Sequence, residues 1–199
     1  DLMINQVRNS NIQLMEGSKV TDLLFDGGNV SGVKVHDETK TKFSIKAKVV
    51  IDGGGRNSIS LRRLNLRRGS PGKGKIALAA HWEGVKGLGR YCYMHISHPG
   101  YTGIAPVGYN RANVVLVVDR NYLIGVNVEQ FFMTTVLGNR LRERILGGGT
   151  PVEKIRTVDS LAYSVKKIRC GGLLLVGDAT GFIDPFTGEG IYLSLRSSQ

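Results

Sequence analysis

The sequence predicts a mixed α/β fold, with a second, antiparallel β-sheet domain inserted into the first. Two apolar segments, one ending at Ile51 and one at Val176, run directly into turns that contain glycine and aspartate. Such segments are typical of strands that are buried on both faces of a sheet. A third observation is the stretch 75–119, where alternating segments are separated by Gly, Pro and Asn. The predicted division of the chain is 1–72 and 166–199 for the first domain and 73–165 for the inserted one, which also carries one long helix.

Composition limits the class of protein. The chain has 199 residues, and its hydrophobic content of 41% supports a folded core. No apolar run reaches the roughly 18 residues of a membrane span. Cys92 and Cys170 lack metal-ligand spacing and indicate free thiols in a reducing, cytoplasmic location. The four histidines have no third ligand near them in sequence, so no metal site is predicted.

The chain is basic, with 27 Lys and Arg against 16 Asp and Glu and a net charge of +11. An anionic membrane, nucleic acid or a phosphate-bearing cofactor would each suit that charge. No nucleic-acid recognition motif is found, so nucleic acid is not a predicted partner. The run Arg62–Lys75 holds six of the positive charges and no acid, and we expect it to be exposed because burying unpaired charges is costly. It predicts either a solvated face or a peripheral contact with a membrane or acidic partner.

The first part of the chain is predicted to consist of short secondary-structure elements. Residues 1–10 predict the end of an amphipathic helix, and 12–15 predict a short strand. Residues 20–26 and 30–36 alternate around Gly27-Gly28-Asn29, which predicts a β-hairpin. A third strand is expected over 42–51.

The inserted domain is predicted to be a sheet followed by one helix. Asn127 and Gln130 have the spacing of a capping box, and apolar residues then recur at helical spacing as far as Ile145. Gly147 and the glycines after it end this helix. The expected strands of the sheet are 75–83, 91–96, 101–107 and 112–119, with a returning strand and bend at 155–158 and 161–163.

The segment from Gly177 to Ile191 carries the clearest chemical signal. Ligands bind at the carboxyl ends of strands in open α/β sheets, and Asp178 there could accept a hydrogen bond from a sugar or ribityl hydroxyl. Gly188 and Gly190 would let a flat ring approach the backbone, and a helix that opens near Gly190 would direct N–H groups towards it. The plainer alternative is a strand–loop–helix whose glycines only make turns.

The run Gly177-Asp178-Ala179-Thr180-Gly181-x-x-x-Pro185-x-x-Gly188-Glu189-Gly190-Ile191 resembles the second flavin motif of a family of FAD-dependent oxidoreductases. That superfamily includes geranylgeranyl reductases, flavin-dependent halogenases and monooxygenases similar to p-hydroxybenzoate hydroxylase. The resemblance implies that Asp178 binds the ribityl chain of FAD. It also implies that the loop from Pro185 to Gly188 lines the isoalloxazine, and that the helix start at Gly190 and Ile191 faces the pyrimidine edge.

A second segment, Asp52-Gly53-Gly54-Gly55-Arg56-Asn57-Ser58, resembles the Asp-Ala-Ser-Gly motif of the same family. Many hydroxylases of the family have an aspartate at the position of Gly54. The resemblance therefore does not imply that this segment binds NADPH directly and tightly. NAD(P)H is still a candidate external electron donor. A glycine-rich turn alone is the alternative. The cofactor-binding residues implied by the two motifs are Gly55, Arg56, Gly177, Asp178, Pro185, Gly188, Gly190 and Ile191.

The resemblance implies an FAD-dependent oxidoreductase with a partial Rossmann-like FAD-binding domain and an inserted substrate domain. The Gly-Glu-Gly form at 188–190 is closer to the geranylgeranyl reductases, which implies an apolar, isoprenoid-like small-molecule substrate. A monooxygenase or a non-catalytic flavin-binding module are the alternatives. Halogenation is disfavoured because Trp82 is the single tryptophan, whereas halogenases carry a tryptophan pair. No catalytic acid or base is assigned.

The family's N-terminal Gly-x-Gly-x-x-Gly segment, which holds the pyrophosphate, is absent from the sequence. The final helix, which begins near Ile191, has about ten residues before Gln199, short of the length at which isolated helices are stable. We therefore expect a fragment of a longer chain that binds FAD poorly and is inactive alone.

Overall fold

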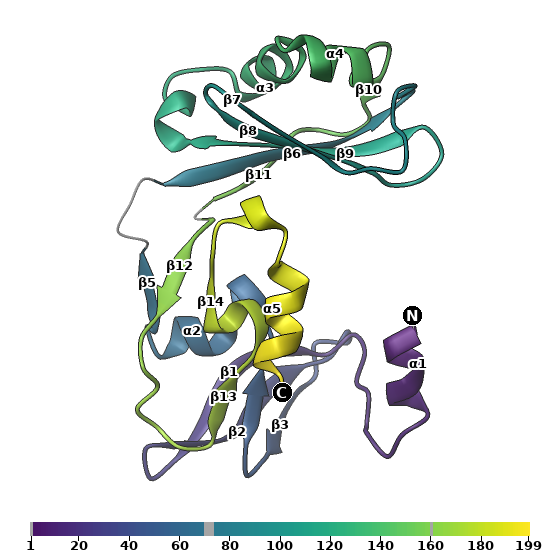
Figure 1. Ribbon diagram of the computed structural model, residues 1–199. Coiled ribbons are helices and arrows are strands. Elements are labelled where there is room, and N and C mark those ends of the chain that lie inside the picture. The colour runs from purple at the N-terminus through teal and green to yellow at the C-terminus, as the bar shows by residue number, and fades with distance from the viewer. Residues whose placement is uncertain (1, 70–73, 160) are drawn as a thin grey trace. The chain divides into compact units, whose positions relative to one another are not determined.

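The computed structural model describes residues 2–69, 74–159 and 161–199, which form two compact units (Figure 1). Unit 1 comprises Asp1–Arg68, Ser164–Phe182 and Gly188–Gln199. Unit 2 comprises Gly69–Tyr163 and Ile183–Thr187. The short piece Ile183–Thr187 lies inside the segment 166–199 that the sequence assigns to the first domain. Within the described residues, no helix has the length and apolar character needed to span a membrane.

The N-terminal segment of unit 1 lacks a packed face. Helix α1 (Leu2–Arg8) forms, but none of its residues is buried. The strand predicted over 12–15 is wrong, since these residues have no regular structure and are exposed. Apolar alternation alone is insufficient there because no neighbouring strand pairs with the segment.

The predicted hairpin is confirmed. Strands β1 (Lys19–Asp26) and β2 (Asn29–His36) pair antiparallel, and β3 (Lys42–Lys46) pairs with β2 on its other side. Gly27 and Gly28 both have positive φ angles, +53° and +83°, as two-residue hairpin turns require. The hairpin therefore forms from local sequence, and its residues Leu23 and Val30 share a core cluster with Leu173.

The single strand predicted over 42–51 is wrong, because the chain forms β3 and a separate strand, β4 (Val50–Asp52). The reason is that the two strands pair with different neighbouring strands. Strand β3 pairs antiparallel with β2, whereas β4 pairs parallel with β13 (Leu173–Leu175). The chain must leave one hydrogen-bonded ladder before it enters the other.

The parallel pair places both motif turns at one edge of unit 1. Val50 lies opposite Leu173 and Asp52 opposite Leu175, and the N–H of Val176 donates to the carbonyl oxygen of Asp52 at 3.1 Å. Each turn therefore begins at the carboxyl end of its strand. The two motif turns therefore lie side by side, although they are distant in sequence, as expected of two segments that the resemblance assigns to one flavin.

The first turn is organised by the buried carboxylate of Asp52, which is 7% exposed. Its Oδ1 accepts from the N–H of Gly54 at 2.8 Å. Its Oδ2 accepts from the hydroxyl of Ser58 at 2.7 Å and from the N–H and hydroxyl of Ser60 at 3.0 and 2.5 Å. Both oxygens are satisfied within the turn, so Asp52 shapes the turn from the inside.

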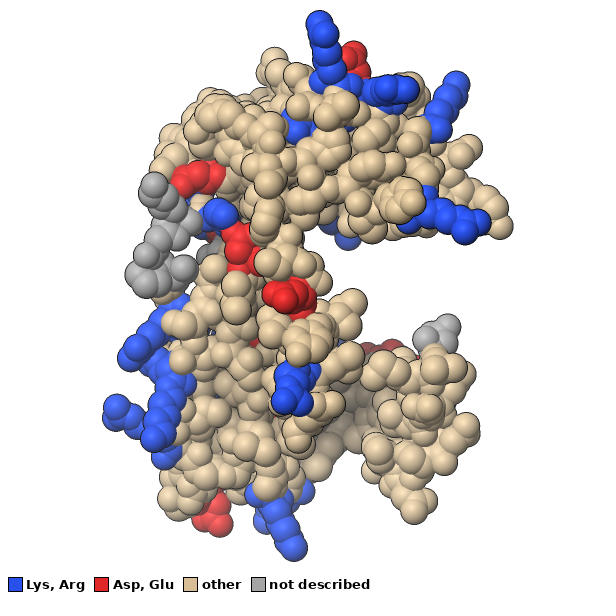
Figure 2. All heavy atoms as spheres, in the orientation of Figure 1, with Lys and Arg blue, Asp and Glu red and all other residues tan. Residues whose placement is uncertain are grey.

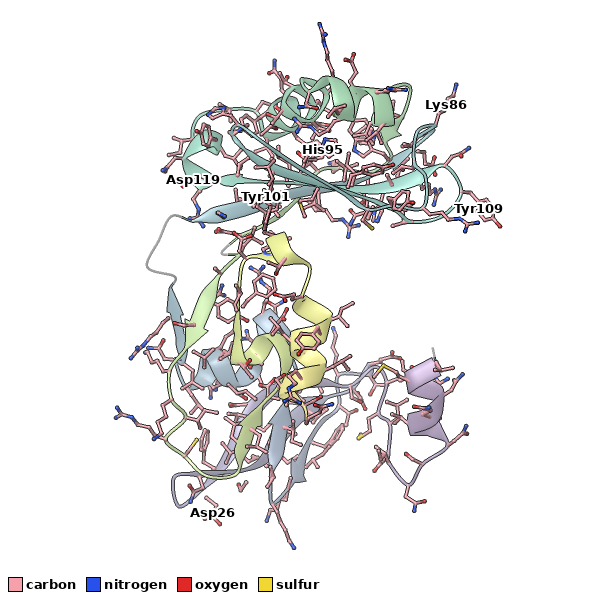
Figure 3. All side chains as sticks on the ribbon, viewed as in Figure 1. Asp26, Lys86, His95, Tyr101, Tyr109 and Asp119 are labelled. Atoms are coloured by element: carbon pink, nitrogen blue, oxygen red, sulfur yellow. The ribbon has the colours of Figure 1, made fainter. Side chains whose placement is uncertain are left out.

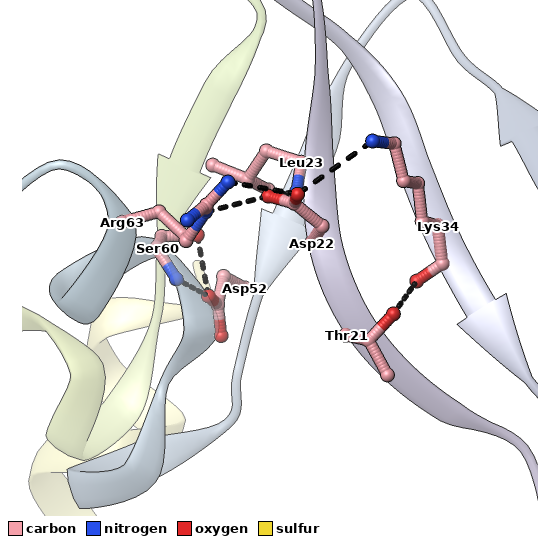
Figure 4. A network of polar contacts seen from close by, with 7 residues as sticks. All are labelled: Thr21, Asp22, Leu23, Lys34, Asp52, Ser60 and Arg63. Atoms are coloured by element: carbon pink, nitrogen blue, oxygen red, sulfur yellow. Dashed lines mark hydrogen bonds and ion pairs between the residues drawn. The ribbon is translucent and has the colours of Figure 1, made fainter.

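Helix α2 (Ile59–Arg63) continues this turn and ties it to the hairpin. Its N-cap is Ser58, whose hydroxyl oxygen accepts from the N–H of Leu61 at 3.1 Å. Arg63 at its other end donates two hydrogen bonds to the carboxylate of Asp22 on β1, at 2.6 and 2.8 Å (Figure 4). The remaining described elements of unit 1 are β5 (Arg67–Gly69), β12 (Tyr163–Val165), β14 (Gly181–Phe182), α5 (Gly190–Ser197) and the 3₁₀ turns η1 (Gly55–Asn57) and η3 (Gly177–Thr180).

Unit 2 is an antiparallel sheet with two helices on one face (Figure 1). The four predicted strands are confirmed. Their order in the sheet is β10-β6-β9-β8-β7, and β11 also pairs with β6. The strands and the 3₁₀ turns of this unit are β6 (Lys75–Glu83), β7 (Tyr93–Ser97), β8 (Gly100–Pro106), β9 (Arg111–Asp119), β10 (Thr150–Pro151), β11 (Arg156–Val158), η2 (Arg120–Leu123) and η4 (Pro185–Thr187).

The single helix predicted from Asn127 is wrong in length, because two helices form, α3 (Val128–Leu137) and α4 (Arg140–Leu146). Asn127 caps α3 as predicted, accepting from the N–H of Gln130 at 2.9 Å. The chain breaks at Gly138 because Asn139 caps a second helix, accepting from two N–H groups of α4.

The break is stabilised by the buried guanidinium of Arg142, which is 2% exposed. It donates to the carbonyl oxygens of Val136 and Thr135 at 2.8 and 2.6 Å, and to the hydroxyl of Ser97 at 2.8 Å. These are carbonyls of the last turn of α3, which lack partners within the helix. Arg142 thereby caps α3 and joins both helices to β7.

We predict that Asp52→Asn lowers the free energy of unfolding by about 2–3 kcal/mol at pH 7, because an amide cannot accept all four hydrogen bonds. Burial raises the pKa of Asp52, but hydrogen bonds from Ser60, Ser58 and Gly54 outweigh burial and hold the pKa below its usual value. The stabilisation is thus present above about pH 4, the unfolded pKa, and is lost as the pH falls through the folded pKa. Urea unfolding at several pH values measures this.

The matched control is Asp26→Asn, at the exposed hairpin end (Figure 3), which we expect to leave stability unchanged. Equal stability of Asp52→Asn and the wild type at pH 7 would contradict the role given to this carboxylate.

Candidate functional site

The two glycine-rich turns are in direct contact within unit 1. Gly55 has a φ of +60°, and a Cβ built on it would lie 3.9 Å from the Cβ of Asp178. A Cβ on Gly53 would lie 3.3 Å from Cγ2 of Val176. The guanidinium of Arg56 lies 5.6 Å from the ring centroid of Phe182. The structure thus brings Gly55, Arg56 and Asp178 together.

The structure of the turn explains why residue 177 is a glycine. Its φ is +62°, and an added Cβ would lie 3.2 Å from the hydroxyl oxygen of Ser194. Its N–H donates to the hydroxyl of Ser197 at 2.8 Å, so the turn rests on helix α5. The buried Ala179 then fixes the turn, and partly buried Asp178 occupies the position directly after the strand edge. Contact between Gly177 and a ligand stays a prediction.

The start of α5 presents open backbone. A Cβ on Gly188 or Gly190 would meet nothing within 4 Å, and Ile191 is 80% exposed. The helical hydrogen bond nearest this end runs from the N–H of Leu193 to the carbonyl of Glu189 at 2.9 Å. The N–H groups of Gly190 and Ile191 precede it and carry the positive end of the helix dipole. A flat, electron-rich group could therefore lie against this backbone.

The first turn also borders a pocket of about 630 Å³ in unit 1. Asp52, Gly53, Gly54 and Asn57 contribute to its lining, together with Ile51, which is 63% exposed. An exposed isoleucine is unusual in the middle of a parallel strand such as β4, because parallel strands are normally covered on both faces. The carboxyl end of β4 thus opens onto a partly apolar space.

Pro185 lies in a loop that a cluster of polar contacts holds within unit 2. The hydroxyl of Tyr101 on β8 donates to Oδ1 of Asp184 at 2.5 Å, and Lys75 on β6 forms an ion pair with Oδ2. The N–H of Phe186 also donates to Oδ1 of Asp184, at 3.1 Å. Figure 3 shows that Tyr101 leaves the sheet on the face opposite α3 and α4. The loop that carries Pro185 is therefore anchored through the residue before it.

The surroundings of Tyr101 fix the protonation of this cluster. Its ring is 8% exposed, meets Phe186 edge-on at 5.2 Å between centroids, and lies 5.6 Å from the ammonium of Lys75. Burial, followed by the neighbouring carboxylate, raises the pKa of Tyr101 well above its usual value. Burial raises the pKa of Asp184 too, but hydrogen bonds from Lys75 and Tyr101 outweigh it and lower that pKa. Tyr101 therefore stays a donor and Asp184 an ionised acceptor.

Sequence reasoning missed this cluster. Asp184 occupies an unspecified position of the glycine-rich motif, and its partners come from other segments of the chain. The one available signal was the alternation that places Tyr101 on a sheet face.

The described part of the basic run is exposed, which confirms that prediction for Arg62, Arg63, Arg67, Arg68 and Lys75. The remaining charge of the run, at position 73, lies outside the described residues. Two of the exposed cations are held by carboxylates, Arg63 by Asp22 and Lys75 by Asp184.

Comparison with known proteins identifies the family. Residues 1–198 match the family described as "FAD binding domain", and the chain belongs to this family. The FAD-dependent oxidoreductase family inferred from the two motifs is thereby confirmed.

Similar proteins include both reductases and halogenases. Digeranylgeranylglycerophospholipid reductase 1 of Methanococcoides burtonii is 27% identical over 90% of this chain and 44% of its own length. The 1H-pyrrole-2-carbonyl-[peptidyl-carrier protein] chlorinase of Pseudomonas fluorescens is 24% identical over 94% of this chain and 44% of its own. The myxobacterial chondrochloren halogenase CndH matches with a TM-score of 0.88 at 22% identity, over 98% of this chain and 47% of its own. The chain thus spans less than half the length of these relatives.

We predict that Tyr101→Phe loosens the loop that carries Pro185. Losing a hydrogen bond to an ionised acceptor should speed amide hydrogen exchange at Phe186 by about tenfold or more. Lys75→Gln, which removes the ion pair, should act in the same direction. Hydrogen-exchange mass spectrometry of the peptide that contains 183–187 measures both.

Tyr109→Phe is the matched control, because Tyr109 is fully exposed (Figure 3). If exchange at Phe186 is as fast in the wild type as in Tyr101→Phe, the anchoring role is refuted.

Proposed function

We propose that the protein is an FAD-dependent reductase that adds hydrogen across a carbon–carbon double bond of an apolar, isoprenoid-like small molecule. The observation that carries the proposal is the junction of the two turns, where Asp178 adjoins Gly55 and the nearby start of α5 leaves open backbone. Bound FAD would supply the hydride chemistry, and the protein supplies orientation and electrostatics.

The residues present fit the cofactor. The carboxylate of Asp178 suits a ribityl hydroxyl, since a charged acceptor forms the stronger kind of hydrogen bond. Gly188 and Gly190 have no side chain where a ring must lie, and the N–H groups of Gly190 and Ile191 would stabilise negative charge on the pyrimidine edge. Pro185 is a further residue that the resemblance assigns to the flavin, and within unit 2 its loop is held through Asp184.

Three observations favour a reductase. The loop has the Gly-Glu-Gly form that resembles the geranylgeranyl reductases. Two similar proteins are digeranylgeranylglycerophospholipid reductases, both 27% identical. Trp82, the single tryptophan, is fully buried in the core of unit 2 and cannot line a substrate site. NAD(P)H is the proposed external electron donor.

Halogenation or hydroxylation is the second candidate, because several similar proteins are named as flavin-dependent halogenases. The same flavin site would serve that chemistry, with oxygen as co-substrate. The two candidates differ in their need for oxygen and in their product.

One experiment distinguishes them. The full-length protein is purified with FAD, reduced anaerobically with NAD(P)H or dithionite, and mixed with a geranylgeranyl lipid. A reductase restores the visible absorbance of oxidised flavin without oxygen, and the lipid gains two hydrogens per reduced double bond. Product that forms only with oxygen and halide, on an aromatic compound, would refute the reductase proposal.

We predict that Asp178→Ala weakens FAD binding roughly ten- to a hundredfold, as expected when a hydrogen bond from a hydroxyl to a carboxylate is lost. Quenching of flavin fluorescence in the full-length apoprotein measures the affinity, and Asp26→Ala is the control. If Asp178→Ala binds FAD as tightly as the wild type, this carboxylate is only a turn residue.

We predict that Gly190→Val abolishes FAD binding while the protein stays folded. The added side chain meets no protein atom within 4 Å of its Cβ, so the substitution fills only the space assigned to the ring. Gly69→Val is the control, since its Cβ is equally free and Gly69 lies outside both motifs. The same titration applies, with circular dichroism to check the fold, and full binding by folded Gly190→Val would place the ring elsewhere.

A further inference from the structure

A basic pocket outside both glycine-rich motifs remains without a function. It has a volume of about 470 Å³ and lies between two segments of unit 1 that are about 100 residues apart in sequence. Figure 2 shows Lys and Arg side chains gathered over the side of unit 1 that carries β5. The pocket is lined by Leu64, Asn65, Leu66, Arg68, Lys166, Lys167 and Arg169.

The pocket is built by backbone structure. Helix α2 ends where Asn65 takes a left-handed φ of +48°, and the N–H of Leu66 donates back to the carbonyl of Leu61 at 3.1 Å. The N–H of Lys166 then donates to the carbonyl of Leu66 at 2.8 Å, which brings the second segment against the first. The fold itself therefore brings the basic residues of both segments together.

The four cations that line the pocket differ in their partners. Lys166 donates its ammonium to the carbonyl of Asn65 at 2.8 Å, just beyond the end of α2. Arg68, Lys167 and Arg169 are exposed, and among the described residues no ion pair to a carboxylate is found for them. The nearby Arg63, in contrast, forms an ion pair with the carboxylate of Asp22.

Phosphate is the ligand class that suits this arrangement. Like charges that line one pocket repel one another unless an anion neutralises them. Arginine binds phosphate oxygens in a bidentate manner and lysine adds a point charge, so two arginines and a lysine match a phosphate group. The leucines of the lining offer apolar surface to whatever carries the phosphate.

We propose that this pocket is a binding site for a phosphate group, carried either by an anionic lipid headgroup or by a soluble phosphate compound. The site does not depend on FAD, because none of its residues belongs to the two glycine-rich motifs. Of its three exposed cations, Arg68 belongs to the basic run, and Lys167 and Arg169 come from the second segment.

The test compares two triple variants of the full-length protein. Arg68→Gln/Lys167→Gln/Arg169→Gln removes the pocket cations. Lys40→Gln/Lys86→Gln/Arg90→Gln removes the same charge from exposed positions elsewhere and is the control. Both variants should unfold at the wild-type temperature, because all six side chains are exposed.

Two binding arms identify the source of the phosphate. Co-sedimentation measures binding to phosphatidylcholine vesicles with and without phosphatidylglycerol, and calorimetry measures binding of inorganic phosphate and glycerol 3-phosphate at constant ionic strength. The wild type should bind in at least one arm, the pocket variant should lose about tenfold or more in affinity, and the control should change by less than about twofold. Binding in the vesicle arm alone identifies a lipid headgroup, and binding in the calorimetric arm identifies a soluble phosphate.

Two results would overturn the proposal. An equal loss in both triple variants would show that diffuse net charge, and not the pocket, attracts anions. A wild type that binds neither anionic vesicles nor phosphate would remove the site altogether.

Discussion

The buried carboxylate of Asp52 is the interaction on which the candidate site depends. It ends β4 and receives four hydrogen bonds, two from the turn that follows and two from Ser60 in helix α2. Because β4 pairs parallel with β13, the geometry of this one turn also sets the edge against which Asp178 lies. Asp52 is thus the internal support of the site, and the residues that the resemblance assigns to the cofactor are its neighbours.

The second motif is divided in a way that matters for function. Gly177–Phe182 and the start of α5 belong to unit 1, whereas Ile183–Thr187 belongs to unit 2, where Lys75 and Tyr101 hold Asp184. The loop that the resemblance places along the flavin ring is therefore fixed by the same sheet that the sequence assigns to substrate binding. Such a loop is ordered by tertiary contacts rather than by its own sequence, which suits a site whose geometry must be held closely.

Much of the fold was predictable because its signals are local. The hairpin follows from Gly27 and Gly28, and the strands of unit 2 follow from alternation. The predictions were wrong where the structure of a segment depends on the segment that it pairs or packs with. Residues 12–15 alternate but have no strand to pair with, and the predicted strand over 42–51 divides because its ends join different sheets. The helix from Asn127 breaks because Asn139 caps a second helix, and Arg142 satisfies the carbonyls at the end of the first, which periodicity does not reveal. In the site, the contact between the two motifs was predictable from their positions after buried strands, whereas the cluster at Asp184 was not, because its partners are remote in sequence.

The most direct test of the account is a crystal structure of the full-length protein with FAD. The account predicts a ribityl hydroxyl within hydrogen-bond distance of the carboxylate of Asp178 and the isoalloxazine against the backbone of Gly188–Gly190, with the carboxylate of Asp52 still bonded to its own turn. FAD bound away from both turns, or a flavin hydroxyl bonded to Asp52 in place of Ser58 and Ser60, would contradict it.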